Sequence, residues 1–226
     1  MTVPPISARS LLRETFAAAK TLYPPLLIIN SPILIYSSLP ILVALGLAGT
    51  PLKIIDWLSS LAFIFVSGAT IFYSYRSLTG NQVNVSEAFQ QANKRFFKLV
   101  MVNILYSLLL LAGLVALMIP GLYISYRLMF SSYAVVIDNY SPQESIKSSW
   151  ELTKGHWWFL FRSTFLLFAV ALLPIILIAL LIDSVGGEST ASEVLANVVV
   201  FLILPFINIY LVLLYVRLGE FAAIIE

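Results

Sequence analysis

The stretch from Trp157 to Ile182 reads WWFLFRSTFLLFAVALLPIILIALLI, and its only charged residue is Arg162. A helix needs roughly 20 predominantly apolar residues to cross the hydrocarbon core of a bilayer. This stretch is longer than that and predicts a membrane-spanning helix. The rest of the chain has the same character, because 60% of its 226 residues are hydrophobic and 11% are charged, whereas a soluble domain has about 25% charged residues. We therefore expect one integral membrane domain over residues 1–226.

Five further windows have a comparable length and composition. They lie near Pro24–Gly46, Ile54–Tyr75, Leu99–Met118, Gly121–Ile137 and Val194–Val216. Together with the first window they predict six transmembrane helices. The expected fold class is therefore all-α, a polytopic membrane protein.

Lysine and arginine gather in alternate connections between these windows. The connection between the fifth and sixth windows carries instead the acidic residues Asp183, Glu188 and Glu193. Because positively charged connections stay in the cytoplasm, we expect both termini to lie there. The basic residues on that side are candidate contacts for anionic lipid, and the clearest are Arg9, Arg13, Lys94, Arg95 and Lys98.

Each basic connection also contains an amphipathic helix, since apolar residues recur there at helical spacing. The three apolar stripes are Leu12, Phe16, Ala19 and Tyr23; Val85, Phe89, Ala92 and Phe96; and Ile146, Trp150, Thr153 and Trp157. The third helix has a start signal, with Ser141 as N-cap, Pro142 at N1 and Glu144 at N3. The chain is thus expected to repeat one unit three times: a cytoplasmic amphipathic helix followed by a helical hairpin. Such helices either position the spans or bind anionic lipid with their basic face.

The segment SWELTKGHWWFLF, from Ser149 to Phe161, lies at the cytoplasmic entrance to the fifth predicted span. It contains the only histidine, His156, of a chain that has no cysteine. Zinc, copper and haem sites need more such ligands, and a GxSxG motif is absent, so we expect no metal, no cofactor and no catalytic residue. Gly155 is expected to end the third amphipathic helix. The candidate interfacial residues are Trp150, Glu151, Lys154, His156, Trp157 and Arg162.

Arg127 is the strongest candidate for a polar site inside the membrane. It lies six residues after Gly121, which corresponds to a depth of about 9 Å at about 1.5 Å per residue. Asp56 and Asp183 are its candidate ion-pair partners, and Tyr126 belongs to the same site. Two interpretations follow, a buried ion pair that locks the bundle or a site for an anionic headgroup or substrate.

Four motifs follow one another between Ile119 and Phe161. In chain order they are Pro120-Gly121, YRLMF (Tyr126–Phe130), YAVVID (Tyr133–Asp138) and SWELTKG (Ser149–Gly155). This order resembles the six-helix membrane domain attached to some bacterial glycerophosphodiester phosphodiesterases, and related stand-alone membrane proteins. The resemblance implies the topology of that domain and a bacterial inner membrane, with a thylakoid membrane as the alternative. It does not imply the phosphodiesterase activity, because that chemistry belongs to a separate barrel domain rich in histidines and carboxylates.

These observations predict a non-enzymatic integral membrane protein. We expect a scaffold, assembly factor or accessory subunit of a membrane complex that organises lipids. Its partners would be membrane lipids and other membrane proteins, and the net charge of +2 is too small to suggest nucleic acid. The alternative is a transporter or lipid-handling protein, which requires a polar cavity near Arg127.

Overall fold

The computed structural model describes residues 7–37, 53–116, 118–184 and 190–225. Within this part of the chain every regular element is an α-helix, and no strand is present. The helices are α1 (Ala8–Ser37), α3 (Lys53–Leu78), α4 (Val85–Ala116), α5 (Met118–Leu128), α6 (Ser131–Ile137), α7 (Pro142–Leu152), α8 (Trp157–Ser184) and α9 (Thr190–Ile225).

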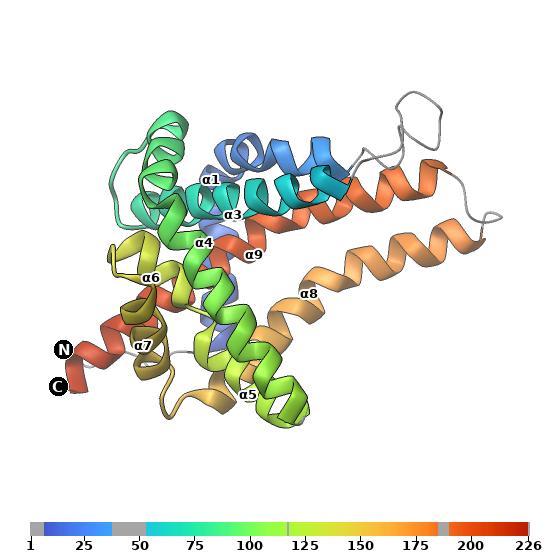
Figure 1. Cartoon of the computed structure of the whole chain (residues 1–226). Coiled ribbons are helices and arrows are strands. Elements are labelled where there is room, and N and C mark those ends of the chain that lie inside the picture. Colours follow the sequence, from blue (N-terminus) through green and yellow to red (C-terminus); the bar gives the residue numbers. More distant parts are fainter. Residues whose placement is uncertain (1–6, 38–52, 117, 185–189, 226) are drawn as a thin grey trace.

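The molecule has two distinct ends. Figure 1 shows the C-terminal part of α9 on the same side as α6 and α7, whereas the far parts of α1, α3, α8 and α9 extend toward the other end. The helices α5, α6 and α7 are short, and all three lie toward the first end. We call this the α7 end.

Four of the described helices are long and apolar enough to cross a membrane. The qualifying segments are Leu58–Leu78, Val85–Val115, Trp157–Leu177 and Asn197–Ala222. They correspond to the predicted second, third, fifth and sixth spans. The predicted first span, Pro24–Gly46, continues into residues 38–52, which lie outside the described residues. Six spans with both termini in the cytoplasm therefore stay a prediction.

The prediction of one continuous fourth span over Gly121–Ile137 is wrong. The structure divides this window into α5, of 11 residues, and α6, of 7 residues, and neither is long enough to cross a bilayer alone. Most of α6 is buried in protein. Non-helical backbone at membrane depth is tolerated where protein surrounds it, and the break between Leu128 and Ser131 has such surroundings.

The Pro120-Gly121 pair also differs from expectation, because it lies inside the first turns of α5 and does not form the turn between two spans. A Cβ atom on Gly121 would lie 2.5 Å from Leu114 Cδ2 and 3.1 Å from the Leu114 amide nitrogen. Gly113 faces the same contact from α4, and a Cβ atom added to it would lie 3.1 Å from Gly121 Cα. These two glycines therefore let α4 and α5 approach closely.

The first two amphipathic segments are not separate helices, because α1 and α4 each run without a break from the amphipathic segment into the apolar one. Only α7 is a separate helix. In α1 the predicted apolar stripe is displaced by one residue: Leu11, Leu22 and Leu26 are buried, whereas Phe16 is 56% exposed. The second stripe packs as predicted, with Phe89 stacked on Phe65 of α3 at 5.7 Å between ring centroids.

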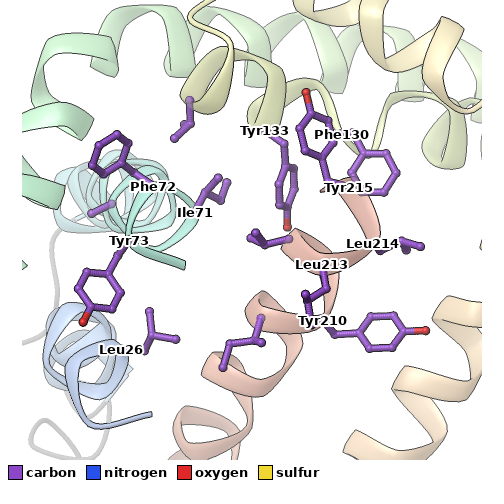
Figure 2. Close-up of a cluster of buried hydrophobic side chains, with 14 of the residues drawn as sticks. Leu26, Ile71, Phe72, Tyr73, Phe130, Tyr133, Tyr210, Leu213, Leu214 and Tyr215 are labelled. Carbon is purple, nitrogen blue, oxygen red and sulfur yellow. The ribbon is translucent and has the colours of Figure 1, made fainter. Parts of the chain in front are cut away.

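Aromatic side chains join the short helices to the long ones in the core. Phe130, at the break between α5 and α6, is fully buried and lies 5.4 Å from Tyr215 of α9 between ring centroids. Tyr133 of α6 lies 5.7 Å from the same Tyr215 ring. Figure 2 shows this group facing Ile71 of α3. The break is therefore fixed against the centre of the molecule.

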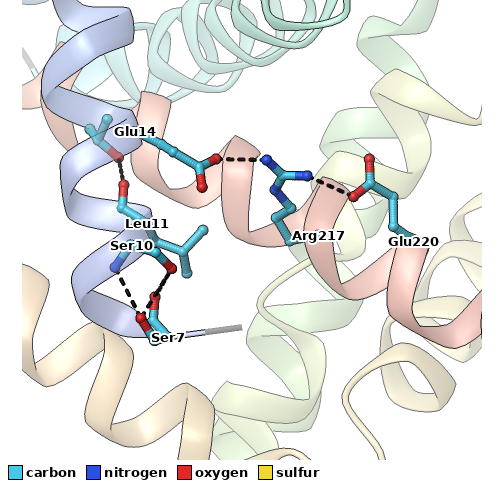
Figure 3. Close-up of polar contacts among 7 residues, drawn as sticks. Ser7, Ser10, Leu11, Glu14, Arg217 and Glu220 are labelled. Atoms are coloured by element: carbon cyan, nitrogen blue, oxygen red, sulfur yellow. Dashed lines mark hydrogen bonds and ion pairs between the residues drawn. The ribbon is translucent and has the colours of Figure 1, made fainter. Parts of the chain in front are cut away.

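At the α7 end, α1 is joined to α9 by charge as well as by apolar contact. Arg217 donates from Nη2 to Glu14 Oε2 at 2.9 Å and from Nη1 to Glu220 Oε2 at 3.0 Å, as Figure 3 shows. The side chains of Arg217 and Glu14 are 42% and 39% exposed. Water screens a pair in this position, so it contributes little to stability.

Candidate functional site

The helix α7 begins where the sequence predicts it. Ser141 is the N-cap and Pro142 follows at the first helical position. The Ser141 amide donates to Glu144 Oε2 at 2.8 Å, and the Glu144 amide donates to Ser141 Oγ at 3.4 Å. These hydrogen bonds to Ser141 lower the pKa of the Glu144 carboxyl below its usual range. The predicted capping box is confirmed.

The inner face of α7 carries three buried hydroxyl side chains. Of the predicted stripe, Thr153 is buried and Ile146 packs against the core. Ser145, Ser149 and Thr153 have no exposed surface, whereas Trp150 is 39% exposed. The Ser145 hydroxyl donates back to the Ser141 carbonyl oxygen at 2.8 Å. Small side chains on this face allow α7 to lie close against α5 and α6.

Ser149 bonds two backbone groups at the break between α5 and α6. Its Oγ donates to the Arg127 carbonyl oxygen at 2.9 Å and accepts from the Phe130 amide at 3.1 Å. The Thr153 hydroxyl lies 3.2 Å from the same Arg127 oxygen and 2.8 Å from the Ser149 carbonyl oxygen. A buried backbone group without a partner is costly, so these hydroxyls stabilise the break. We call Ser149 and Thr153, with the backbone of Arg127 and Phe130, the hydroxyl clamp.

The Arg127 side chain is buried against aromatic rings. It is 4% exposed, and its Cζ lies 4.5 Å from the Trp150 ring centroid and 5.8 Å from that of Tyr123. Its Nε is buried and has no hydrogen-bond partner. Among the residues that the structure describes, no carboxylate forms an ion pair with Arg127. The side chains of its two predicted partners, Asp56 and Asp183, lie outside the described residues.

The Tyr126 ring packs against aromatic residues of α8. Its ring makes edge contacts with Trp157 at 6.3 Å and with Phe161 at 5.9 Å between centroids. Trp157 in turn stacks on Phe161 at 5.6 Å. Tyr126 therefore ties α5 to the first turns of α8.

His156 and Gly155 shape the short connection between α7 and α8. Gly155 has φ +79°, a conformation that favours glycine. The C-cap of α7 is Thr153, so Gly155 lies one residue further out than the position expected for it. The His156 Nδ1 is hydrogen-bonded to the Lys154 carbonyl oxygen at 2.9 Å, and its ring packs edge-on against Phe221 at 5.5 Å. Among the described residues, no three histidine, aspartate or glutamate side chains gather in a possible metal site.

The predicted lipid contacts fall into two groups. Arg9, Arg13 and Lys94 are exposed. Lys98 is occupied within the protein, because its Nζ donates to Asn139 O at 2.9 Å and to Asn139 Oδ1 at 3.1 Å. Arg95 is half-buried and donates to Gln91 Oε1 at 2.8 Å.

The remaining predicted interfacial residues are accessible from outside. Glu151, Lys154 and Arg162 are exposed, and Lys147 approaches Glu151 at 4.0 Å in a pair that is mostly in contact with solvent. The Trp158 side chain is 69% exposed, whereas the indole nitrogen of its neighbour Trp157 is buried. The outer face of α7 and the start of α8 thus combine charge with aromatic surface.

Two clefts lie elsewhere in the described structure. One of about 740 Å³ is lined by α1, α3 and α4 and includes Pro32, Ser60 and Asn103. The other, of about 370 Å³, lies at the turn after α3, beside Tyr73 and Asn81. Neither of these two clefts is lined by Arg127 or by another residue of α5.

Sequence reasoning missed the hydroxyl clamp, although a signal for it was present. Ser145, Ser149 and Thr153 recur at intervals of four residues and therefore share one helical face. It also missed the hydrogen bond from the Tyr215 hydroxyl to the Asp138 carboxylate, which joins α9 to the end of α6. The two residues are 77 positions apart, and no local pattern indicates such a contact.

Comparison with known families gives one match. The family described as the membrane domain of glycerophosphoryl diester phosphodiesterase matches residues 107–221, just over half of the chain. The search of curated proteins and the search of solved structures each give no match. The matched segment contains the hydroxyl clamp, Arg127 and the bond between Asp138 and Tyr215, so the motifs that predicted the resemblance are those that organise the fold. The chain is an integral membrane protein and belongs to the family of the membrane domain of glycerophosphoryl diester phosphodiesterase.

Proposed function

We propose that this protein is a non-enzymatic scaffold or accessory subunit of a membrane complex, and that it binds anionic lipid and partner membrane proteins at its α7 end. One observation carries the proposal: α7 is fixed from within by the hydroxyl clamp, while its outer face is accessible. A short helix held rigidly at a membrane surface presents its outer side chains in one geometry. Such preorganisation lowers the entropic cost of binding.

The composition of the outer face supports this role. Lys147, Glu151 and Lys154 are exposed on α7 and just after it, next to the exposed rings of Trp150 and Trp158. Aromatic side chains favour the headgroup layer, and basic ones favour anionic lipid. The same surface suits the rim of a protein interface, in which aromatic residues are enriched. We place the protein in a bacterial inner membrane on the strength of the family resemblance.

The internal use of the polar residues also supports a structural role. Ser149 and Thr153 are bonded to backbone, and His156 is bonded to the carbonyl oxygen of its neighbour Lys154. The transporter alternative required a cavity at Arg127, and neither described cleft reaches that residue.

Purification from native membranes in mild detergent tests the proposal. We expect anionic lipid and a stoichiometric protein partner to remain bound to the wild-type chain. Since each basic residue near an anionic surface contributes about 1 kcal/mol, replacing Lys147 and Lys154 with Gln should reduce the retained partner and lipid. The control is Lys53→Gln, which removes the same kind of charge on the side predicted to be outer. Recovery of the wild-type chain alone, or equal losses in the control, would contradict the proposal.

A further inference from the structure

Two arginines from neighbouring helices share one aromatic ring near the α7 end. Arg76 lies in the last turn of α3, and Arg95 lies in the first half of α4. The Cζ atoms of both are 5.7 Å from the centroid of the Phe72 ring. Phe72 is itself buried, with 7% of its surface exposed. Two positively charged side chains therefore contact the same ring.

Neither charge is neutralised within the described part of the chain. No carboxylate there forms an ion pair with Arg76 or Arg95. The Nε atoms of both are buried without a hydrogen-bond partner, and the one acceptor bonded to Arg95 is the uncharged Gln91 amide. Two like charges at a partly dry surface repel each other, and an anion between them would remove that cost.

Helix geometry alone explains only one of the two residues. A cation in the last turn of a helix is stabilised by the helix dipole, which explains Arg76 at the end of α3. Arg95 lies well beyond the first turn of α4, where the helix dipole has little effect. The dipole therefore does not offset the repulsion between Arg95 and Arg76.

Guanidinium groups bind phosphate in particular, because their parallel N–H groups match two phosphate oxygens. We propose that Arg76 and Arg95 form a binding site for a phosphate group, either that of an anionic phospholipid or that of a free phosphate ester. The connection that follows Arg76 is one of those predicted to be cytoplasmic, and lipid phosphates lie at that level. Lys98 is not part of the site, because Asn139 already occupies its ammonium group.

The phosphate site deepens the proposed function by naming one place where an anion binds. The identification of a lipid as the ligand rests on the proposed function. The recognition of a phosphate group by the two arginines does not depend on it. The site lies on α3 and α4, whereas the outer face of α7 carries the proposed scaffold surface. Substitutions can therefore disrupt the phosphate site and the scaffold surface separately.

The test uses the full chain in nanodiscs that contain phosphatidylglycerol within phosphatidylcholine. We expect phosphatidylglycerol to be enriched around the wild type, as measured by native mass spectrometry. Losing a charge-assisted hydrogen bond should weaken retention about tenfold or more in Arg76→Gln and Arg95→Gln. The control is Lys53→Gln, which removes one positive charge on the side predicted to be outer and should retain the lipid. Equal loss in Lys53→Gln, or full retention in Arg95→Gln, would overturn the site.

A second arm separates the two sources of phosphate. If glycerol phosphate or inorganic phosphate displaces the retained lipid in wild type, the phosphate group itself is recognised. If neither displaces it while the loss in Arg95→Gln persists, the site takes a lipid phosphate. An absence of enrichment in wild type, together with no binding of either soluble phosphate, contradicts the proposal.

A charge-conserving variant shows whether a loss of lipid reflects the missing guanidinium group or misfolding. Arg95→Lys keeps the charge and loses the paired N–H groups, so we expect retention between those of wild type and Arg95→Gln. Retention equal to that of wild type would show that charge alone is sufficient and would overturn a guanidinium site. If Lys147 and Lys154 variants lose their protein partner while this binding persists, the scaffold role and the anion site are independent. If Arg95→Gln loses lipid while the partner stays bound, only the anion site is affected.

Discussion

The helix α7 and the first turns of α1 lie at the α7 end, and the two helices are attached to the rest of the protein by different means. The helix α1 buries Leu11, Leu22 and Leu26 and adds a half-exposed ion pair between Glu14 and Arg217. The helix α7 has 11 residues and turns Ser145, Ser149 and Thr153 inward. Burying a leucine contributes about 1.5–3 kcal/mol, so a long helix can rely on apolar area. A short helix lacks that area, and α7 instead bonds backbone groups at a helix break.

The largest expected effect comes from breaking the clamp. Ser149→Ala leaves the buried Phe130 amide without its acceptor and removes a donor from the Arg127 carbonyl. Leaving a buried polar group unsatisfied costs about 1–3 kcal/mol, so we expect a clear fall in the melting temperature in detergent. The control is Ser148→Ala, because Ser148 makes none of these bonds. Equal stability of the two variants would show that the clamp contributes nothing.

Crowding the contact between α4 and α5 should cause the next largest loss of stability, since α5 contributes backbone groups to the hydroxyl clamp. Gly121→Ala places a methyl group 2.5 Å from Leu114 Cδ2 and 3.1 Å from its amide nitrogen. Overpacking of this kind costs about 1–3 kcal/mol, and we expect the lower half of that range because the leucine side chain can move. The control is Gly219→Ala in α9, where a Cβ would meet no atom within 4 Å. If both variants are equally stable, the close approach of α4 and α5 is unimportant.

The ion pair on α1 should contribute less than either. Glu14→Gln removes a contact in which both side chains are about 40% exposed, and exposed pairs contribute about 0.2–1 kcal/mol. The melting temperature should therefore change little, and the difference from wild type should shrink in high salt. A loss as large as that of Ser149→Ala would reverse the comparison between α1 and α7.

The smallest effect concerns pH. Because its hydrogen bonds to Ser141 lower the pKa of Glu144 in the folded protein, the capping box stabilises α7 at neutral pH. That contribution is present above the pKa of an unfolded glutamate and is lost as pH falls through the lower, folded value. We expect Glu144→Gln to remove this pH dependence, as measured by the melting temperature from neutral pH to well below 4.5, the ordinary pKa of a glutamate. An identical acid response of wild type and variant would contradict it.

Local patterns predicted those features whose cause lies within one segment. The apolar run from Trp157 is long enough to specify α8, and the Ser141–Glu144 spacing specifies the start of α7. The break before Phe130 has no such signal, because neither glycine nor proline lies between Leu128 and Ser131. Its backbone groups are satisfied by Ser149 and Thr153, which lie about 20 residues later in the chain. A compensation of this kind becomes visible only when α5 and α7 are placed side by side.

The structure adds ring contacts to Arg127 that the sequence did not predict. The sequence predicted a carboxylate partner because intramembrane charges usually pair, and the side chains of Asp56 and Asp183 lie outside the described residues. The described contacts of Arg127 are the rings of Trp150 and Tyr123. Trp150 was assigned from the sequence to the interfacial belt, and no local pattern indicates its contact with Arg127.

Amide hydrogen exchange of residues 145–152 in nanodiscs tests most directly whether α7 is held by its hydroxyl face. We expect these amides in wild type to be protected nearly as well as those of the buried part of α9. We also expect Ser149→Ala to lose this protection while Ser148→Ala keeps it. Rapid exchange of α7 in wild type, or equal protection in both variants, would contradict the claim that the hydroxyl clamp fixes this helix.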